Sequence, residues 1–450
     1  NDFGGKIMKY IFLANEYDLV VDDTFELFYR GVICLNNPYE YYILIRCEKG
    51  HPYPRYYTFT PKSQDVGDYP LTITLLDNNH QIIDEGTTIL HVQQPHQPKE
   101  RLNVLCIGDS LTFNGVWPSE GYRRFAKTGG YPLGNGFYDS LYMIGSCKKE
   151  IDGSIVGYEG YGSWTWKSFC TNDLVSTKSP IWVRVQNHHL DENDQHSIWT
   201  SGNLEWVLES IEKKRLKFKR GNNNYSPSPL IEKEFIHLYG GIHHDSIFID
   251  DFTFEIGNPF WHNESKEIDF KEYAKKQEVD KIDLVYILLT WNGLYRPYDQ
   301  EFNRHLDYAK ILIHKIHQAF PNAHITLLGI PICSVNGGIA ANYGANGPYS
   351  DTFGTISTAF NYNKCLENFV NQEEYKTYCR YVDCKAQFDS EYNMPSIEKP
   401  VNSRSKITER IGTNGVHPNM EGYLQLGDAF YRALVLSLIH ISEPTRPEPI

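Results

Sequence analysis

The sequence predicts an α/β protein in which a parallel sheet is covered by helices on both faces and is preceded by a small all-β domain. Residues 1–98 contain short segments in which apolar and polar residues alternate with period two, as in strands. Near-continuous apolar runs then recur at 102–107, 284–289 and 324–329, as expected of parallel strands that are buried on both faces. Apolar residues at helical spacing within 301–320 supply the strand, helix, strand order of a parallel crossover.

The N-terminal segments with period-two alternation are separated by turn-forming clusters. They lie at residues 24–29, 41–46, 56–59, 71–76 and 87–92. Short strands at this spacing predict a β-sandwich of immunoglobulin-like or jelly-roll type over residues 1–98. Pro95 and Pro98 then end the strand pattern, because proline donates no ladder hydrogen bond, and they mark a linker.

The second predicted domain spans residues 99–436 and closes with a helix at 420–435. A β-rich insert at about 171–260 interrupts its strand and helix alternation, and the sequence leaves open whether this insert folds by itself. The last residues, 437–450, are interpreted as a non-native tail.

Charge and apolar patterning exclude some classes of partner. The formal net charge of -13 argues against nucleic acid, which requires clustered Lys and Arg. The basic run at 213–220 alternates with apolar residues and is interpreted as a solvated strand face. No stretch approaches the roughly 20 apolar residues that cross a bilayer, so no membrane partner is expected.

Neither the N-terminal sequence nor the cysteines indicate the cellular compartment of the protein. No signal peptide is visible at the N-terminus. The nine cysteines show no zinc-type spacing and no complete disulfide framework, which leaves one or two bridges open.

A serine follows the first buried strand directly, in Gly108-Asp109-Ser110-Leu111. Ligands of open α/β sheets bind at the carboxyl ends of the strands, so Ser110 is a candidate nucleophile. The structural alternative is a simple strand-to-helix turn in which the serine is a cap.

Three other segments carry the groups that a nucleophilic serine needs. His417 lies in a loop before the last helix and could act as a base. Asn292 follows the 284–289 run and could donate a side-chain hydrogen bond to an oxyanion. Gly162 belongs to a glycine-rich turn whose backbone N–H could be a second donor. Taken singly, each segment is more simply explained as a turn or as the start of a helix.

Together, the order Ser110, Gly162, Asn292, His417 along an α/β pattern resembles the four sequence blocks of the SGNH (GDSL-like) hydrolase family. The resemblance covers residues 102–435 apart from the insert. It implies a three-layer α/β/α domain in which Ser110 is the nucleophile and His417 the general base. It also implies an oxyanion hole formed by Ser110, Gly162 and Asn292, with Ser163 as an alternative to Gly162.

The sequence departs from the family pattern near the histidine and the asparagine. The third block loses the carboxylate that usually follows the asparagine, because Gly293 follows Asn292. Asn414 stands where the family has an aspartate three residues before the histidine. Support for the His417 ring is therefore expected from Asn414 or from a carboxylate in another loop, with Asp389 as the candidate. Asp109 is expected to fix the serine loop by accepting backbone hydrogen bonds.

The predicted function is hydrolysis of carboxylic esters through an acyl-serine intermediate, with no metal or organic cofactor. The high Tyr and Trp content and the resemblance favour an acylated glycan as substrate, deacetylation as the reaction and an extracellular location. Trp164, Trp291 and Trp261 are expected to line an acyl or sugar pocket. The alternatives are an esterase for feruloyl, lipid or polyester substrates, or a glycan-binding or virion-associated protein whose hydrolase site has decayed.

Overall fold

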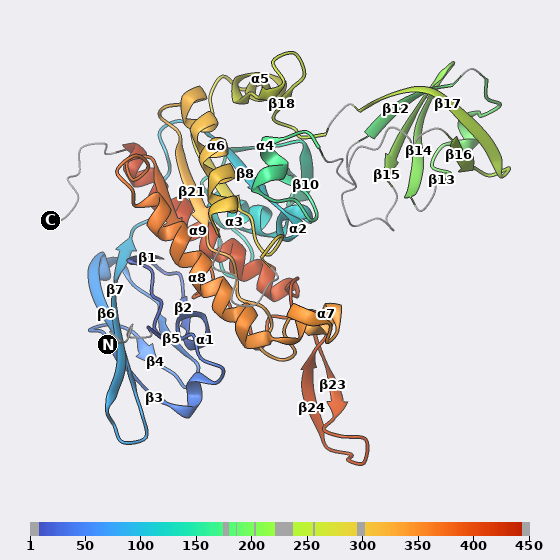
Figure 1. Ribbon diagram of the computed structural model, residues 1–450. Coiled ribbons are helices and arrows are strands. Elements are labelled where there is room, and N and C mark those ends of the chain that lie inside the picture. Colours follow the sequence, from blue (N-terminus) through green and yellow to red (C-terminus); the bar gives the residue numbers. More distant parts are fainter. Residues whose placement is uncertain are drawn as a thin grey trace, which may run out of the picture.

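The computed structural model describes residues 9–173, 180–185, 187–201, 204–220, 237–254, 257–294 and 302–442 (Figure 1). It contains a mixed α/β domain with a parallel sheet, a β-rich N-terminal region and a separate small barrel. The predicted α/β fold class is confirmed in this form.

The parallel sheet is built around β8, which precedes the candidate serine. Its strands are β8 (Leu102–Gly108), β9 (Leu141–Ile144), β10 (Cys147–Ile151), β11 (Ser154–Gly160), β20 (Leu284–Leu288), β21 (His324–Leu328) and β22 (Cys379–Val382). Their order is β10-β11-β8-β20-β21-β22, and β9 also pairs with β8. All pairs are parallel except β10 with β11. The three predicted apolar runs are β8, β20 and β21.

Two groups of helices cover the sheet. The helices are α2 (Ser110–Phe113), α3 (Val116–Ala126), α4 (Trp166–Cys170), α5 (Phe270–Lys276), α6 (Asn303–Ala319), α7 (Ala340–Tyr343), α8 (Thr352–Val370) and α9 (Met420–Ser442). In one group, α3 and α9 pack together and Phe430 of α9 contacts Tyr286 of β20. In the other, Tyr362 of α8 contacts Phe302 beside α6 and accepts a hydrogen bond from Trp166 of α4. All five residues of β20 are buried, as expected when both faces are covered.

The N-terminal region is β-rich, as predicted, but it forms two open sheets and not a clear sandwich. Its elements are β1 (Glu16–Val20), β2 (Phe25–Phe28), α1 (Tyr29–Val32), β3 (Tyr42–Arg46), β4 (His51–Pro52), β5 (Tyr56–Phe59), β6 (Gly67–Leu76) and β7 (Ile82–Gln93). The sheets have the orders β1-β7-β6-β3 and β2-β5-β4. Their buried residues belong to the same apolar cluster as the α/β core. The sheets are therefore packed partly against the α/β domain, which alternation along the chain cannot reveal.

A buried ion-pair network joins the N-terminal region to the helices of the α/β domain. Asp23 accepts hydrogen bonds from Arg124 of α3 and from Arg432 of α9, each at 2.6 Å. Arg124 also pairs with Asp428 at 2.7 Å. Burial alone would raise the pKa of Asp23, but the two guanidinium groups hold it below its usual value. Asp23 therefore remains charged between two fixed cations.

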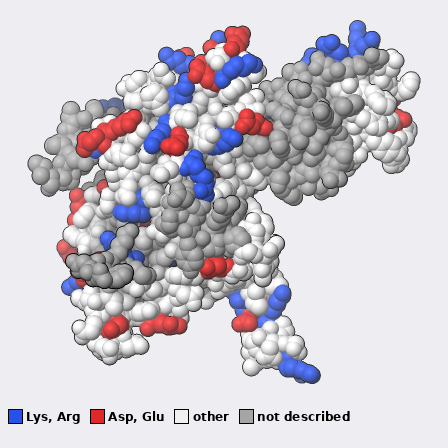
Figure 2. Space-filling view, viewed as in Figure 1, with Lys and Arg blue, Asp and Glu red and all other residues white. Residues whose placement is uncertain are grey.

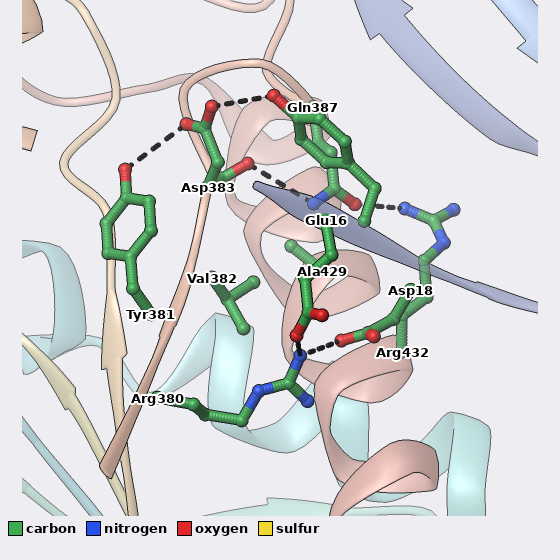
Figure 3. A pocket seen from close by; sticks show the side chains of 10 residues that line it. Glu16, Asp18, Arg380, Tyr381, Val382, Asp383, Gln387, Ala429 and Arg432 are labelled. Carbon is green, nitrogen blue, oxygen red and sulfur yellow. Dashed lines mark hydrogen bonds and ion pairs between the residues drawn. The ribbon is translucent and has the colours of Figure 1, made fainter. Parts of the chain in front are cut away.

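A second polar cluster closes the neighbouring part of this interface (Figure 3). Arg380 pairs with Asp18 at 2.8 Å, and Asp383 accepts a hydrogen bond from the Tyr17 hydroxyl at 2.9 Å. The space left between these side chains is only about 10 Å³. The N-terminal region and the α/β domain are therefore in close polar contact.

The insert contains a closed barrel with its own apolar core. Its strands are β12 (Pro180–Val185), β13 (Ile198–Ser201), β14 (Leu204–Glu212), β15 (Arg215–Arg220), β16 (His237–Gly240) and β17 (Asp245–Phe254). Trp199, Trp206 and Phe218 lie in this core, which is separate from the main cluster. The predicted basic strand is β15, in which Leu216 and Phe218 point inward.

Two short hairpins complete the described elements. They are β18 (Trp261–His262) with β19 (Glu267–Ile268), and β23 (Ser396–Pro400) with β24 (Thr408–Gly412). The second hairpin projects from the domain just before the segment that carries His417 (Figure 1).

The last helix is longer than predicted. α9 continues to Ser442, so the boundary expected at residue 436 falls inside it. Ser437 is buried and accepts a hydrogen bond from the Tyr286 hydroxyl at 2.9 Å. Residues 443–450 lie outside the described part of the chain.

Charge, helix hydropathy and cysteine pairing are further features of the described residues. On the face shown in Figure 2, basic and acidic side chains are interspersed over the α/β domain and do not gather into one basic patch. No helix among the described residues is long and apolar enough to span a membrane. All nine cysteines are unpaired.

Replacing Asp23 by Asn should lower the free energy of unfolding by about 3 kcal/mol, because it leaves two buried guanidinium groups without their shared counter-charge. Urea unfolding followed by circular dichroism measures this loss. Asp22→Asn is the matched control, since the Asp22 pair with Lys62 is exposed and its loss should cost at most about 0.5 kcal/mol. Equal effects of the two substitutions would contradict the importance of the buried network.

Candidate active site

Ser110 is held in a tight turn between β8 and α2. It is the first residue of α2, and the Oδ1 atom of Asp109 caps this helix by accepting a hydrogen bond from the Leu111 N–H at 3.0 Å. Gly108 is required at the end of β8, because a Cβ there would lie 2.0 Å from Oγ1 of Thr112. The local sequence thus brings the serine to the carboxyl end of the sheet's inner strand.

The loop that carries His417 is fixed by side-chain amides. Oδ1 of Asn414 accepts hydrogen bonds from the backbone N–H groups of Val416 at 2.9 Å and His417 at 2.8 Å. Oδ1 of Asn342 accepts a further one from the Gly415 N–H at 2.6 Å. A Cβ at position 415 would lie 2.0 Å from the carbonyl oxygen of Gly338, so only glycine fits there.

These two loops bring Ser110 and His417 into direct contact. Nε2 of His417 lies 2.9 Å from Oγ of Ser110, although 307 positions separate the two residues in the chain. Burial lowers the pKa of His417 below its usual 6.5. The ring is therefore neutral at pH 7, the state in which Nε2 can accept the serine proton.

Neither candidate for support of the ring fills that role in the structure. The Asn414 side chain bonds to backbone N–H groups, as described above. Asp389 forms a two-point ion pair with Arg55 of the N-terminal region, at 3.1 and 2.8 Å. Among the residues that the structure describes, no carboxylate hydrogen-bonds to the imidazole of His417. The described arrangement is a Ser–His pair and not a triad.

Asp109 joins the serine loop to the loop after β20. Its Oδ2 atom accepts hydrogen bonds from the Thr290 N–H at 2.8 Å, the Thr290 hydroxyl at 2.6 Å and the Asn292 amide at 3.3 Å. Asp109 is completely buried, and this burial raises its pKa to about 6. The raised value means that the charged carboxylate costs stability at neutral pH, and that this cost declines as the pH falls below about 6 and is gone near the ordinary value of 3.8. The expected loop-fixing role of Asp109 agrees with these contacts.

Asn292 and Gly162 reach the same edge of the sheet as Ser110. The Asn292 amide also donates to the backbone carbonyl of Trp164 at 3.0 Å, which connects the glycine-rich turn to the loop after β20. The Tyr161 N–H donates to the Gly108 carbonyl at 3.0 Å, so this turn lies beside the end of β8. In the described part of the chain, the N–H of Gly162 has no hydrogen-bond partner.

Of the three tryptophans expected to line a pocket, Trp261 lines a groove to which Trp164 and Trp291 do not contribute. Trp164 is 0% exposed and Trp291 is 1% exposed, so both rings belong to the core. Trp261 is half-buried and lines a groove whose lining residues include neither Ser110 nor His417. The prediction of a shared aromatic pocket is therefore wrong for Trp164 and Trp291, because both rings are buried in the protein interior.

Several residues that position the site were not identified from the sequence. Thr290 is one of them, although its hydroxyl makes the shortest hydrogen bond to Asp109. Asn342 and Arg55 lie far from the motifs in the chain and carry no local signal. In the described ranges, no group of three or more His, Cys, Asp or Glu side chains could hold a metal ion.

The fold and the site together define an α/β protein with a Ser–His pair at the carboxyl edge of a parallel sheet. Comparison with protein-family models and with curated protein sequences finds no match. The chain is similar to several solved structures of esterases, at low TM-scores.

One of these structures is a carbohydrate esterase family 2 enzyme with a carbohydrate binding domain from Corynascus thermopiles (Myceliophthora fergusii), at 11% identity over 95% of this chain and 92% of that chain, with a TM-score of 0.29. Another is a family two carbohydrate esterase from Clostridium thermocellum in complex with cellohexaose, at 10% identity over 95% and 94%, with a TM-score of 0.28. A peptidoglycan O-acetylesterase is matched at 12% identity over 75% and 92%, with a TM-score of 0.25.

Replacing Thr290 by Val should lower the free energy of unfolding by about 2 kcal/mol, because it removes a hydroxyl donor from a buried carboxylate at nearly constant volume. Urea unfolding at pH 7.5 measures the effect. Thr87→Val is the matched control, since its hydroxyl bonds to Thr72 on an exposed strand face. A loss at Thr290 no larger than at Thr87 would show that Asp109 does not depend on this donor.

Proposed function

We propose that this protein is a serine esterase that hydrolyses carboxylic esters through an acyl-serine intermediate. The observation that carries the proposal is the 2.9 Å contact between Oγ of Ser110 and Nε2 of His417 at the carboxyl edge of the sheet. A serine hydroxyl is a weak nucleophile until a neighbouring base accepts its proton, and this geometry supplies that base.

In the proposed reaction, His417 removes the Ser110 proton as Oγ attacks the ester carbonyl carbon. The imidazolium then donates this proton to the leaving alcohol, and the acyl group stays on Ser110. A water molecule, deprotonated by the same ring, then attacks the acyl-serine. The ring returns this proton to Oγ of Ser110 as the acyl C–O bond breaks and the acid is released. Each step uses His417 alternately as base and acid, and none requires a metal.

The negative oxygen of the tetrahedral intermediate requires hydrogen-bond donors near Ser110. The backbone N–H of Ser110 opens a helix, where it lacks an intrahelical acceptor. The N–H of Gly162 has no partner in the described part of the chain, and it is the second proposed donor. The Asn292 amide is the third, because its 3.3 Å bond to Asp109 is longer than its 3.0 Å bond to the Trp164 carbonyl, and Thr290 still satisfies the Asp109 carboxylate.

Packing beside the site favours a small acyl group. Trp164 belongs to the glycine-rich turn and Trp291 precedes Asn292, and both rings are buried. Their rings fill the interior beneath two of the loops that surround Ser110. This packing leaves little space there for a long acyl chain. We therefore propose acetyl as the acyl group, and a polysaccharide as the carrier because the high Tyr and Trp content of the chain favours a glycan.

Replacing Ser110 by Ala should reduce turnover of p-nitrophenyl acetate and of acetylated xylan by at least about 10³-fold, since no other group can form the acyl intermediate. Release of p-nitrophenol and of acetate are the two readouts. Ser63→Ala, at an exposed serine of the N-terminal region, is the control and should retain full activity. Absence of serine-dependent release from every ester tried would favour a glycan-binding protein with a decayed site.

The pH dependence of kcat/KM should report the lowered pKa of His417. Activity requires the neutral ring, so it should be constant at neutral pH and decline on the acidic side with a midpoint below 6.5. Stopped assays from pH 4.5 to 8 measure the profile. Protonation of Asp109 near pH 6 adds a second proton to the acidic limb, so a limb steeper than one proton would show that both groups matter. A midpoint above 7 would instead indicate a carboxylate against the ring.

A further inference from the structure

A groove of about 520 Å³ lies on the α/β domain, apart from the Ser110–His417 pair. It is bounded by the end of α4, the β18–β19 hairpin and one face of α6. These elements lie on the same side of the domain in Figure 1. Because none of the residues proposed for catalysis lines it, the groove requires a different explanation.

Trp261 provides an aromatic surface in this groove. Its side chain is half-buried, and its ring contacts no other aromatic ring or cation among the described residues. Pairing of Trp261 with Ile268 across the hairpin fixes its position. Ile311 of α6, which is 45% exposed, adds apolar surface to the same groove. A partly exposed indole fixed in a concave site is suited to stacking against the C–H face of a ring-shaped ligand.

Polar groups surround this apolar surface and their charges balance. Asp173 and Glu267 contribute two carboxylates, and Lys266 and Lys315 contribute two ammonium groups. Lys315 and Glu267 already pair at 2.5 Å. Asn172 also lines the groove, and its Oδ1 accepts a hydrogen bond from the Asn258 N–H at 2.9 Å. Amides, ammonium groups and carboxylates bind hydroxyl groups well, and the balanced charge favours an uncharged ligand.

A row of packed aromatic rings connects the groove to the catalytic edge. Trp164, in the turn of Gly162, contacts Phe169 of α4 with ring centroids 4.9 Å apart. Phe169 in turn contacts Phe260 at 5.8 Å, and Phe260 directly precedes Trp261. The Asn258 amide bonds to the carbonyls of Phe169 and Thr171 and holds α4 beside this segment. The groove is therefore held at a fixed separation from Ser110, as an extended polymer spanning both would require.

We propose that the groove is a saccharide subsite that binds an uncharged pyranose unit of the polysaccharide, with the sugar ring stacked on Trp261. The proposal rests on the proposed esterase function for its substrate. It adds that the enzyme binds the polymer backbone at a distance from the ester that it cleaves.

Trp261→Ala removes the stacking surface, and Ile311→Trp fills the groove while leaving Trp261 in place. Both should raise KM for acetylated xylan about tenfold, the loss expected from one aromatic contact, and leave kcat/KM for p-nitrophenyl acetate within about twofold of wild type. Tyr131→Ala is the control, because Tyr131 is 97% exposed and does not line the groove. Circular dichroism and thermal melting establish that each variant is folded.

Binding without catalysis separates the groove from the esterase claim. Isothermal titration of the Ser110→Ala protein with xylohexaose and with cellohexaose should detect binding that Trp261→Ala or Ile311→Trp weakens about tenfold. Esterase activity with unchanged KM and unchanged hexasaccharide affinity in both groove variants would overturn the subsite and leave the esterase intact. Hexasaccharide binding that depends on Trp261, in a protein with no serine-dependent activity, would support the subsite and overturn the esterase. Loss of activity on both substrates in the folded Ile311→Trp variant would also overturn the subsite, because it would mean that the groove acts on Ser110 itself.

Discussion

The buried carboxylate of Asp109 is the constraint on which the candidate site depends. It caps the helix that begins with Ser110, and it accepts three hydrogen bonds from the loop that contains Asn292. Burying a charge is unfavourable unless several donors compensate, and the raised pKa shows that part of this cost remains. The buried charge thus lowers local stability, and its hydrogen bonds hold the Ser110 loop and the Asn292 loop in one arrangement.

The histidine side of the site is organised differently. Neutral amides from Asn414 and Asn342 fix the backbone of the His417 loop, whereas Asp389 is engaged by Arg55. The ring is therefore placed by its backbone and by its contact with Ser110. Because no carboxylate among the described residues bonds to it, the protonated ring gains no ion-pair stabilisation from them, and burial disfavours the protonated form further. The His417 imidazole is therefore a weak base that stays neutral at mildly acidic pH.

The sequence predicted the elements that depend on local pattern. The buried strands β8, β20 and β21 and the crossover helix α6 follow from apolar periodicity, and the contact between Ser110 and His417 was expected from the resemblance of four motifs to the SGNH blocks. Interactions between distant segments could not be predicted in the same way. Nothing near Asp389 indicates that Arg55 will reach it, and the exposure of Trp164 or Trp291 depends on packing that no periodicity encodes. The N-terminal alternation indicated strands correctly, but it did not show that these strands share a core with the α/β domain.

The placement of Asp23 between Arg124 and Arg432 also determines how the chain can be divided. A fragment beginning after the proline-containing linker would retain both arginines inside its helical layer and lose the anion that they share. Arg432 would then have no carboxylate partner among its described hydrogen bonds, and Arg124 would keep only its pair with Asp428. The boundary that is visible in the sequence is therefore not a suitable site for truncation. The β-rich segment shares its apolar core with the α/β domain, and both parts should unfold together in a single cooperative transition.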